Sequence, residues 1–392
     1  MIGVLPEFRL EKWFSTYEFV APHSLTASDA QTMTVAELLA LAGRGIDDLN
    51  DIGMGYVSPW GTPELREAVA ATYDVITSDD VLAFTGAQEA LFWLLAELLH
   101  DGGHAVVTVP NYQSVETMPL AGPADVTGLP LWRGSGAELT WTLDLERLES
   151  LLRPDTRCVV VNFPNNPTGF IPDRETFAAL ADLCHQRGIV LVSDEVYRGI
   201  EVDPANTLPQ AADLTPTAVS VNVMSKSYGL PGLRVGWLAT RDRGLLARLE
   251  NRKHYTTICN PGLTEHLAVV ALGVGDRIHA RNRAIVTDNI ARVRAFFADY
   301  PELFEFEAPM GGCVSFPRFL GAEGPEVFVR RAIDEAGVLT LPASLYRSAL
   351  ADVPADRFRI GFGRTSLPET LGALRDHLEA RTVPAAARPW SV

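Results

Sequence analysis

Lys226 is one of three lysines in this 392-residue chain, with Lys12 and Lys253, and it lies in the segment MSKSYGLPGLRVGW. A lysine amine can form a Schiff base with an aldehyde or act as a base, provided that its surroundings lower its pKa from about 10.4. The chain otherwise uses arginine for positive charge. The rare lysine at position 226 is therefore a candidate for covalent chemistry.

Three patterns before Lys226 place further chemical groups at the ends of predicted strands. Asp194 is the second residue of SDEVY, Asn166 lies in NNPTG, and FTGAQEALFWLL combines a strand, a glycine turn at Gly86 and a helix start. A carboxylate can pair with a cation, and the amides of a helix start can bind phosphate. Each pattern alone is common, since a strand-ending aspartate is most often a cap or turn residue. Their order and spacing favour one shared site.

The elements that must position these groups follow from Val-rich apolar runs that alternate with helical patterns. We expect strands at residues 81–84, 105–109, 158–163, 189–193 and 218–224, and helices at 88–99 and 174–186. Near-continuous apolar strands indicate a mostly parallel sheet covered on both faces. The fold class is therefore α/β, with a doubly wound sheet that binds ligands at the carboxyl ends of its strands.

The pattern also predicts how the chain is divided. We expect residues 46–275 to form the large domain and residues 276–381 a smaller α+β domain, with a long helix at 279–300. Residues 1–45 should complete the smaller domain, and residues 382–392, rich in proline and alanine, should form a loose tail.

Composition excludes several classes of protein. A net charge of −16 argues against nucleic acid as a partner, because phosphate binding needs clustered lysine and arginine. No apolar run approaches the roughly 18 residues of a membrane span, and the N-terminal segment does not resemble a signal peptide, so we expect a cytoplasmic protein. The four cysteines have no metal-binding spacing, so we expect buried thiols and no metal.

Taken in order, NNPTG, SDEVY and SKSYGLPGLRVGW resemble the class I/II aminotransferases, pyridoxal-phosphate enzymes of the aspartate aminotransferase fold type. The resemblance covers about residues 49–380 and implies pyridoxal 5′-phosphate as cofactor. It implies that Lys226 forms the internal aldimine and moves the substrate proton. It also implies that Asp194 holds the pyridine nitrogen protonated, and that Tyr197 and Asn166 contact the phenolic oxygen. Lys226, Asp194 and Tyr197 are the expected catalytic residues.

The same resemblance implies the rest of the cofactor site. Tyr112 would stack on the pyridine ring, although a loop aromatic that covers the core is the alternative. Tyr56 would reach the phosphate of a neighbouring subunit, which makes the expected unit a homodimer with a shared active site. The phosphate-binding residues implied are Gly86, Ala87, Gln88, Ser225 and Arg234.

Substrate recognition is expected from Arg359, whose planar guanidinium would bind the α-carboxylate through two hydrogen bonds. Arg357 and Arg364 are close in sequence and are the alternatives for this role. Asn166 is also expected to contact the substrate.

Two segments depart from the family pattern. Val223 stands where many relatives carry a serine that contacts the phosphate, and Ser225 is expected to take part of that role. Near the N-terminus, HSLTASDAQTMTVAELLALAG replaces a glycine-rich segment, so Ser28, Asp29 and Gln31 are expected to contact the substrate side chain. An acid there predicts selection of a basic amino acid. The alternative is that Ser28 or Asp29 caps a helix at 35–42.

These residues predict an aminotransferase that moves an amino group from an L-amino acid to a 2-oxo acid. The alternative is a cyclase, lyase or oxidase acting on a polar or guanidino amino acid, similar to capreomycidine synthase, because the same residues serve those reactions. A third class, the ligand sensor of a transcription regulator, is disfavoured since only about 45 residues precede the cofactor domain and they show no helix-turn-helix pattern.

Overall fold

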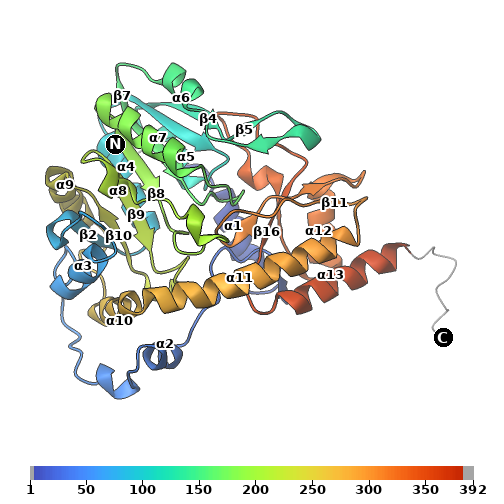
Figure 1. Ribbon diagram of the computed structural model, residues 1–392, viewed down its shortest axis with the longest axis horizontal. Coiled ribbons are helices and arrows are strands. Elements are labelled where there is room, and N and C mark those ends of the chain that lie inside the picture. Colours follow the sequence, from blue (N-terminus) through green and yellow to red (C-terminus); the bar gives the residue numbers. More distant parts are fainter. Residues whose placement is uncertain (1–3, 383–392) are drawn as a thin grey trace.

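The computed structural model describes residues 4–382, and its main feature is a seven-stranded sheet in the order β2-β10-β9-β8-β7-β3-β4 (Figure 1). Neighbouring strands are parallel, except that β10 runs antiparallel to both β2 and β9. The strands are Val81–Phe84 (β2), His104–Val109 (β3), Asp125–Pro130 (β4), Thr156–Asn162 (β7), Val190–Asp194 (β8), Val219–Val223 (β9) and Gly236–Ala239 (β10).

Helices cover both faces of this sheet because alternate strand residues are apolar on both sides. Leu82 and Phe84 pack into the layer of one face, whereas Val81 and Ala83 pack into the layer of the other. The first layer contains α4 (Ala87–Leu98), α5 (Ser114–Leu120) and α9 (Arg243–Lys253). The opposite layer contains α3 (Pro63–Ala70), α6 (Leu145–Leu151), α7 (Arg174–Gln186), α8 (Ala211–Leu214) and α10 (Gly262–Gly273).

A second body of short strands and long helices is built from both ends of the chain. Strand β1 (His23–Ser24) pairs in parallel with β14 (Val338–Leu339), so the N-terminal segment is fixed to the C-terminal part. The other strands of this body are β11 (Phe304–Glu305), β12 (Val314–Ser315), β13 (Arg318–Phe319), β15 (Leu341–Pro342) and β16 (Phe358–Gly361). Strands β5 (Trp132–Arg133) and β6 (Thr140–Trp141) form a separate antiparallel pair between β4 and β7 in the chain.

Long helices and a phenylalanine cluster hold this second body together. Phe297, Phe304, Phe319, Phe328 and Phe358 are buried and their rings pack against one another. Figure 1 shows the longest helix, α11, running from the side of α10 towards α13. The helices of this body are α1 (Arg9–Tyr17), α11 (Gly275–Ala298), α12 (Gly324–Ala336) and α13 (Leu367–Thr382). Helix α2 (Val35–Leu41) packs instead on the large sheet, through Leu38 and Leu39.

The doubly wound, mostly parallel α/β prediction is confirmed, and the structure adds two strands that the sequence did not predict. These are β10, which is only four residues long, and β4, which begins with an aspartate and contains Gly128. Each lacks a long Val-rich run, and only its neighbours make it a strand. The domain boundaries stay a prediction, and residues 383–392 of the expected tail lie outside the described residues.

One local alternative is wrong. Helix α2 is capped by Thr34, whose hydroxyl accepts a hydrogen bond from the Glu37 amide while the Glu37 carboxylate accepts one from the Thr34 amide. This capping box leaves neither Ser28 nor Asp29 with a capping role. Both side chains are therefore available for other contacts.

Within residues 4–382, no helix is long and apolar enough to cross a membrane. The four cysteines are free thiols, and three of them, Cys158, Cys184 and Cys313, are buried.

Candidate active site

A cavity of about 710 Å³ opens at the carboxyl edge of the large sheet. The last residues of β7, β8 and β9, which are Asn162, Asp194 and Val223, form part of its wall. Because parallel strands end at the same edge, motifs far apart in sequence meet there. The residues singled out from the sequence that line it are Ser28, Asp29, Ala87, Gln88, Tyr112, Asn166, Asp194, Tyr197, Val223, Ser225, Lys226, Arg234 and Arg364.

Lys226 lies just beyond β9, and its amine points into this cavity. Its Nζ donates a hydrogen bond to the Ser28 hydroxyl at 2.8 Å. Burial lowers the pKa of Lys226, and although Asp29 opposes this effect, Arg359 adds to it. The amine therefore loses its proton more easily than an ordinary lysine, which suits a nucleophile or base.

Asp194 is the last residue of β8 and is 5% exposed. Burial raises the pKa of Asp194 to about 6. The hydrogen bond from the Val196 amide and the charge of Lys226 favour the ionised carboxylate, but they offset only part of this shift. A cation bound against this carboxylate would remove that penalty. The position is suited to a protonated ring nitrogen.

Tyr197 and Asn166 lie on the same wall. The Tyr197 side chain is 1% exposed, its hydroxyl has no partner of normal hydrogen-bond geometry among the described residues, and burial raises its pKa well above the usual value. Asn166 accepts hydrogen bonds from Arg359 at 3.2 Å and from the Tyr346 hydroxyl at 3.4 Å. A buried hydroxyl without a partner is rare in a finished protein interior, and it marks a place for a ligand oxygen.

The three candidate arginines are in different places. Arg359 is fully buried behind Asn166, donates to the carbonyl and hydroxyl of Thr26, and leaves its Nε without a partner. Arg364 lines the cavity but is held by both carboxylate oxygens of Asp29, at 2.7 and 2.9 Å. Arg357 faces away, over the Trp141 ring. Arg359 does not line the cavity itself, but it contacts Asn166 in the cavity wall, and its buried Nε has no hydrogen-bond partner among the described residues.

A cradle for an anion lies at the start of α4. Gly86 caps the helix with a φ of 91°, and a Cβ added there would be 2.7 Å from Nη2 of Arg234. Arg234 itself adopts a left-handed backbone with a φ of 52°, which is unusual for arginine and brings its guanidinium to the helix start. Gln88 and Ser225 complete the wall. The helix amides and one guanidinium fit a phosphate.

Two tyrosines differ in their placement. Tyr112 lines the cavity, its hydroxyl donates to Glu11 at 2.6 Å, and its ring also packs on Phe8 at 5.1 Å between centroids. Tyr56 is 91% exposed and does not line the cavity of its own chain.

The altered N-terminal segment enters the site only in part. Ser28 and Asp29 line the cavity, but Gln31 does not, because its amide oxygen accepts hydrogen bonds from Thr365. Asp29 is already paired with Arg364. Of the three side chains expected to contact the substrate, Gln31 is therefore directed elsewhere.

Sequence reasoning missed the contribution of α1. Glu11, Phe14 and Glu18 line the same cavity, and their spacing of three and four residues places them on one face of a helix. This spacing in the sequence indicates a helix face that could line a site. No motif of the resemblance points to it, because α1 precedes all of them.

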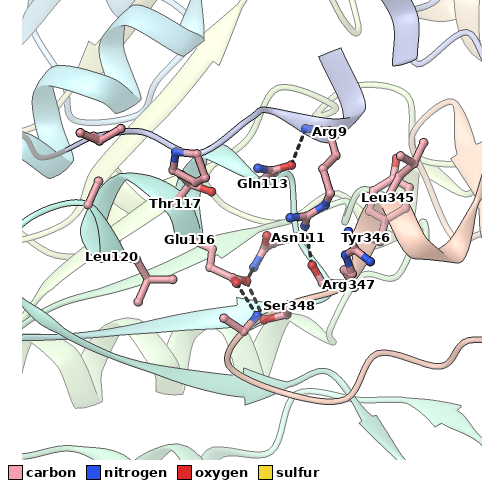
Figure 2. A pocket seen from close by; sticks show the side chains of 14 residues that line it. Arg9, Asn111, Gln113, Glu116, Thr117, Leu120, Leu345, Tyr346, Arg347 and Ser348 are labelled. Atoms are coloured by element: carbon pink, nitrogen blue, oxygen red, sulfur yellow. Dashed lines mark hydrogen bonds between the residues drawn. The ribbon is translucent and has the colours of Figure 1, made fainter. Parts of the chain in front are cut away.

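A second cavity of about 380 Å³ lies beside the start of α1 (Figure 2). Asn111 and Gln113, the neighbours of Tyr112, line it together with Arg9 and Glu116. Figure 2 shows Arg9, Gln113 and Arg347 joining the start of α1 to its surroundings. This cavity contains none of the predicted site residues.

The donors of the large cavity match the cofactor implied by the sequence. Lys226 provides an amine, Asp194 a carboxylate that needs a cation, and Tyr197 a hydroxyl that needs a partner. The cradle between Gly86 and Arg234 is suited to a phosphate. Together they fit pyridoxal phosphate.

Comparison with known proteins gives the same result. Residues 26–376 match the family model of aminotransferase class I and II. Capreomycidine synthase of Streptomyces vinaceus is 31% identical, over 95% of this chain and 94% of its own. A PLP-dependent aminotransferase structure from Streptococcus suis has a TM-score of 0.88 at 27% identity, covering 97% of this chain and 99% of that one. The PLP-dependent cyclase OrfR has a TM-score of 0.86 at 27% identity, covering 96% and 98%. This chain belongs to the class I and II aminotransferase family, and its cofactor is pyridoxal 5′-phosphate.

Proposed function

We propose that this enzyme transfers an amino group from an L-amino acid to a 2-oxo acid. The proposal rests on the Lys226 amine, which faces the cavity, has a lowered pKa and, among the described residues, forms a hydrogen bond only with the neutral hydroxyl of Ser28. Pyridoxal phosphate supplies an aldehyde for this amine and a conjugated ring that takes up electrons from the substrate Cα. Once the substrate amine has displaced it from the cofactor, an unprotonated Lys226 Nζ would accept the Cα proton and deliver it to the carbon of the former aldehyde.

The other side chains hold the reactants in place. Asp194 stabilises a protonated ring nitrogen, and Tyr197 with Asn166 binds the ring oxygen. Arg359 binds the substrate α-carboxylate with its free donor, next to Asn166. The phosphate is bound by the helix amides of Ala87 and Gln88, by Ser225 and by Arg234.

We also propose a cytoplasmic homodimer. Tyr56, Met54 and Tyr255 are 91%, 87% and 81% exposed, which is unusual for large apolar side chains and supports an interface between copies of the chain. Tyr56 of one subunit would reach the phosphate of the other. The free cysteines support a reducing compartment.

The test is a spectral titration. Purified wild-type enzyme and Lys226→Ala are loaded with pyridoxal phosphate, and amino acids are added one at a time, with and without 2-oxoglutarate. Transamination predicts a change in cofactor absorbance with at least one amino acid, and an amino-acid product from the keto acid by mass spectrometry. No change in wild type with any amino acid would disprove the proposal.

A second candidate is cyclisation, elimination or oxidation of a polar or guanidino amino acid. It is supported by the similarity to capreomycidine synthase and to the cyclase OrfR. An arginine–pyruvate transaminase of Pseudomonas aeruginosa is also 31% identical, over 63% of both chains, so relatives of both kinds exist. Product formation without any 2-oxo acid, or oxygen consumption, would favour this candidate.

A further inference from the structure

Helix α1 forms a carboxylate-bearing wall over the cavity that contains Lys226. Glu11 lies within the helix, and Glu18 follows its last residue with a helical backbone (φ −58°, ψ −37°). Both side chains and Phe14 line the cavity. Two acids and one aromatic ring therefore face the space next to the catalytic amine.

The helix is anchored firmly enough to define a binding wall. The Arg9 amide donates to the Gln113 side chain at 3.0 Å, and Gln113 donates in turn to the carbonyl of Glu7 at 2.9 Å. The Arg9 guanidinium donates to the carbonyl of Arg347 at 2.6 Å (Figure 2). Leu10 is buried among residues of the C-terminal part. The wall is thus tied to both parts of the molecule.

The two carboxylates of this wall, Glu11 and Glu18, differ from that of Asp29 because they have no charged partner among the described residues. Asp29 is neutralised by Arg364, and Arg234 lies in the cradle suited to the phosphate. Glu11 accepts a hydrogen bond only from the neutral hydroxyl of Tyr112, and the Glu18 carboxylate has no hydrogen bond or ion pair among the described residues. Neither Glu11 nor Glu18 forms an ion pair with a cation in the part of the chain that the structure describes.

The electrostatics of Glu18 indicate which ligand would relieve this imbalance. Partial burial and then the negative charges of Asp29 and Glu11 raise the pKa of Glu18, whereas Lys226 and Arg364 oppose the shift. A positive charge placed between Glu11 and Glu18 would favour both carboxylates. A second observation marks the cavity as a ligand site: the buried Tyr197 hydroxyl, proposed above to bind the cofactor, has no hydrogen-bond partner of normal geometry among the described residues.

We propose that Glu11 and Glu18 determine substrate specificity by binding a positively charged side chain of the amino-acid substrate, with Phe14 packing against its alkyl part. The proposal rests on the proposed use of an amino acid as substrate and names its class. It applies whether the reaction ends in transamination or in cyclisation, since both begin with the same bound amino acid. Asp29 is paired with Arg364 and is not assigned this role.

Arginine and citrulline provide the test, because their side chains have nearly the same shape and only arginine is charged. The half-saturating concentration of each for the cofactor spectral change is measured in wild type, Glu11→Gln, Glu18→Gln and the control Glu7→Gln. Glu7 is exposed on the same segment and does not line the cavity. Lysine and norleucine form a second charged and neutral pair that tests an ammonium group.

Wild type and Glu7→Gln are expected to prefer the charged member of a pair by about tenfold or more, the effect of one charged hydrogen bond. Glu11→Gln and Glu18→Gln should each lose most of this preference while retaining their response to citrulline.

If the half-saturating concentrations of wild type are equal for the charged and neutral members of both pairs, the inference is wrong, but the proposed function stands. The inference is also wrong if Glu18→Gln raises the half-saturating concentrations of arginine and citrulline by the same factor. No response to any amino acid would instead overturn the proposed function, and the inference with it.

Discussion

The chemistry of Lys226 depends on what surrounds its amine. Ser28 gives it a neutral hydrogen-bond partner, and burial lowers its pKa. Ser28 belongs to the segment that departs from the family pattern. A residue that the sequence suggested for substrate contact therefore also holds the Lys226 amine in place.

Lys226→Ala is expected to lower turnover by at least about 10²-fold, the lower limit of what a positioned base contributes. The variant should also lose the absorbance of a covalently bound cofactor, because no other described lysine lines the cavity. Lys12→Ala is the control, since this exposed lysine of α1 does not line the cavity. An active Lys226→Ala enzyme would contradict the assigned role.

Asp194→Asn is expected to stabilise the cofactor-free protein at neutral pH. Burial raises the pKa of Asp194 from 3.8 to about 6, so keeping it ionised in the folded state costs on the order of 3 kcal/mol at pH 7. Below both values the carboxyl is protonated in the folded and the unfolded chain, and the cost disappears. The cost grows as the pH rises from about 4 to 6 and stays constant above.

Urea unfolding of cofactor-free wild type and Asp194→Asn at pH 5, 6, 7 and 8 measures this difference. Turnover of the cofactor-loaded variant should fall, because the ring nitrogen loses its carboxylate. If Asp194→Asn is less stable than wild type at every pH, then the contacts of the Asp194 carboxylate stabilise the folded protein by more than its burial destabilises it.

At the scale of elements, the site depends on how closely the end of β16 approaches the N-terminal segment. A Cβ on Gly363 would lie 2.1 Å from the carbonyl oxygen of Asp29, and one on Gly361 would lie 2.3 Å from that of Ala27. The backbone on both sides of Ser28 is therefore set by glycines more than 330 positions away in sequence.

Gly363→Ala is expected to destabilise the protein by roughly 1–3 kcal/mol or more, the usual cost of overpacking. It should also weaken turnover by displacing Ser28 from Lys226. Gly372→Ala is the control in α13, because nothing lies within 4 Å of its added Cβ, and it should be neutral or stabilising by up to about 1 kcal/mol. Thermal unfolding compares them, and equal stability would refute the close-packing argument.

The strands that carry the site were the most predictable elements. The Val-rich runs at β2, β7, β8 and β9 were found from sequence within two residues of each end, because strands buried on both faces are continuously apolar. Strand β10 was not found, since its four residues pair antiparallel between β2 and β9 only once both exist.

At the scale of the whole molecule, two copies of the chain are proposed to share each active site. Lys226→Ala and Tyr56→Ala should each be impaired, because one lacks the amine and the other lacks a phosphate contact supplied to its partner. In a mixture that exchanges subunits, a Tyr56→Ala subunit would keep Lys226 and receive Tyr56 from its partner, which restores one complete site in each mixed dimer.

Activity of the mixed sample above the sum of the separate samples is the expected result, with each variant incubated alone as the control. Sedimentation should show a dimer for wild type and both variants. Additive activity in a sample shown to exchange subunits would mean that Tyr56 does not complete a neighbouring site.

Sequence alone determined the family, the cofactor and the α/β sheet, because catalytic groups near strand ends leave short motifs of fixed order. The roles of the individual residues stay predictions. Tertiary structure decided that Arg364 forms an ion pair with Asp29, whereas Arg359 keeps a donor without a partner among the described residues. It also brought Glu11 and Glu18 to the cavity. Those outcomes depend on contacts between distant parts of the chain, whose geometry is set by packing and not by local sequence.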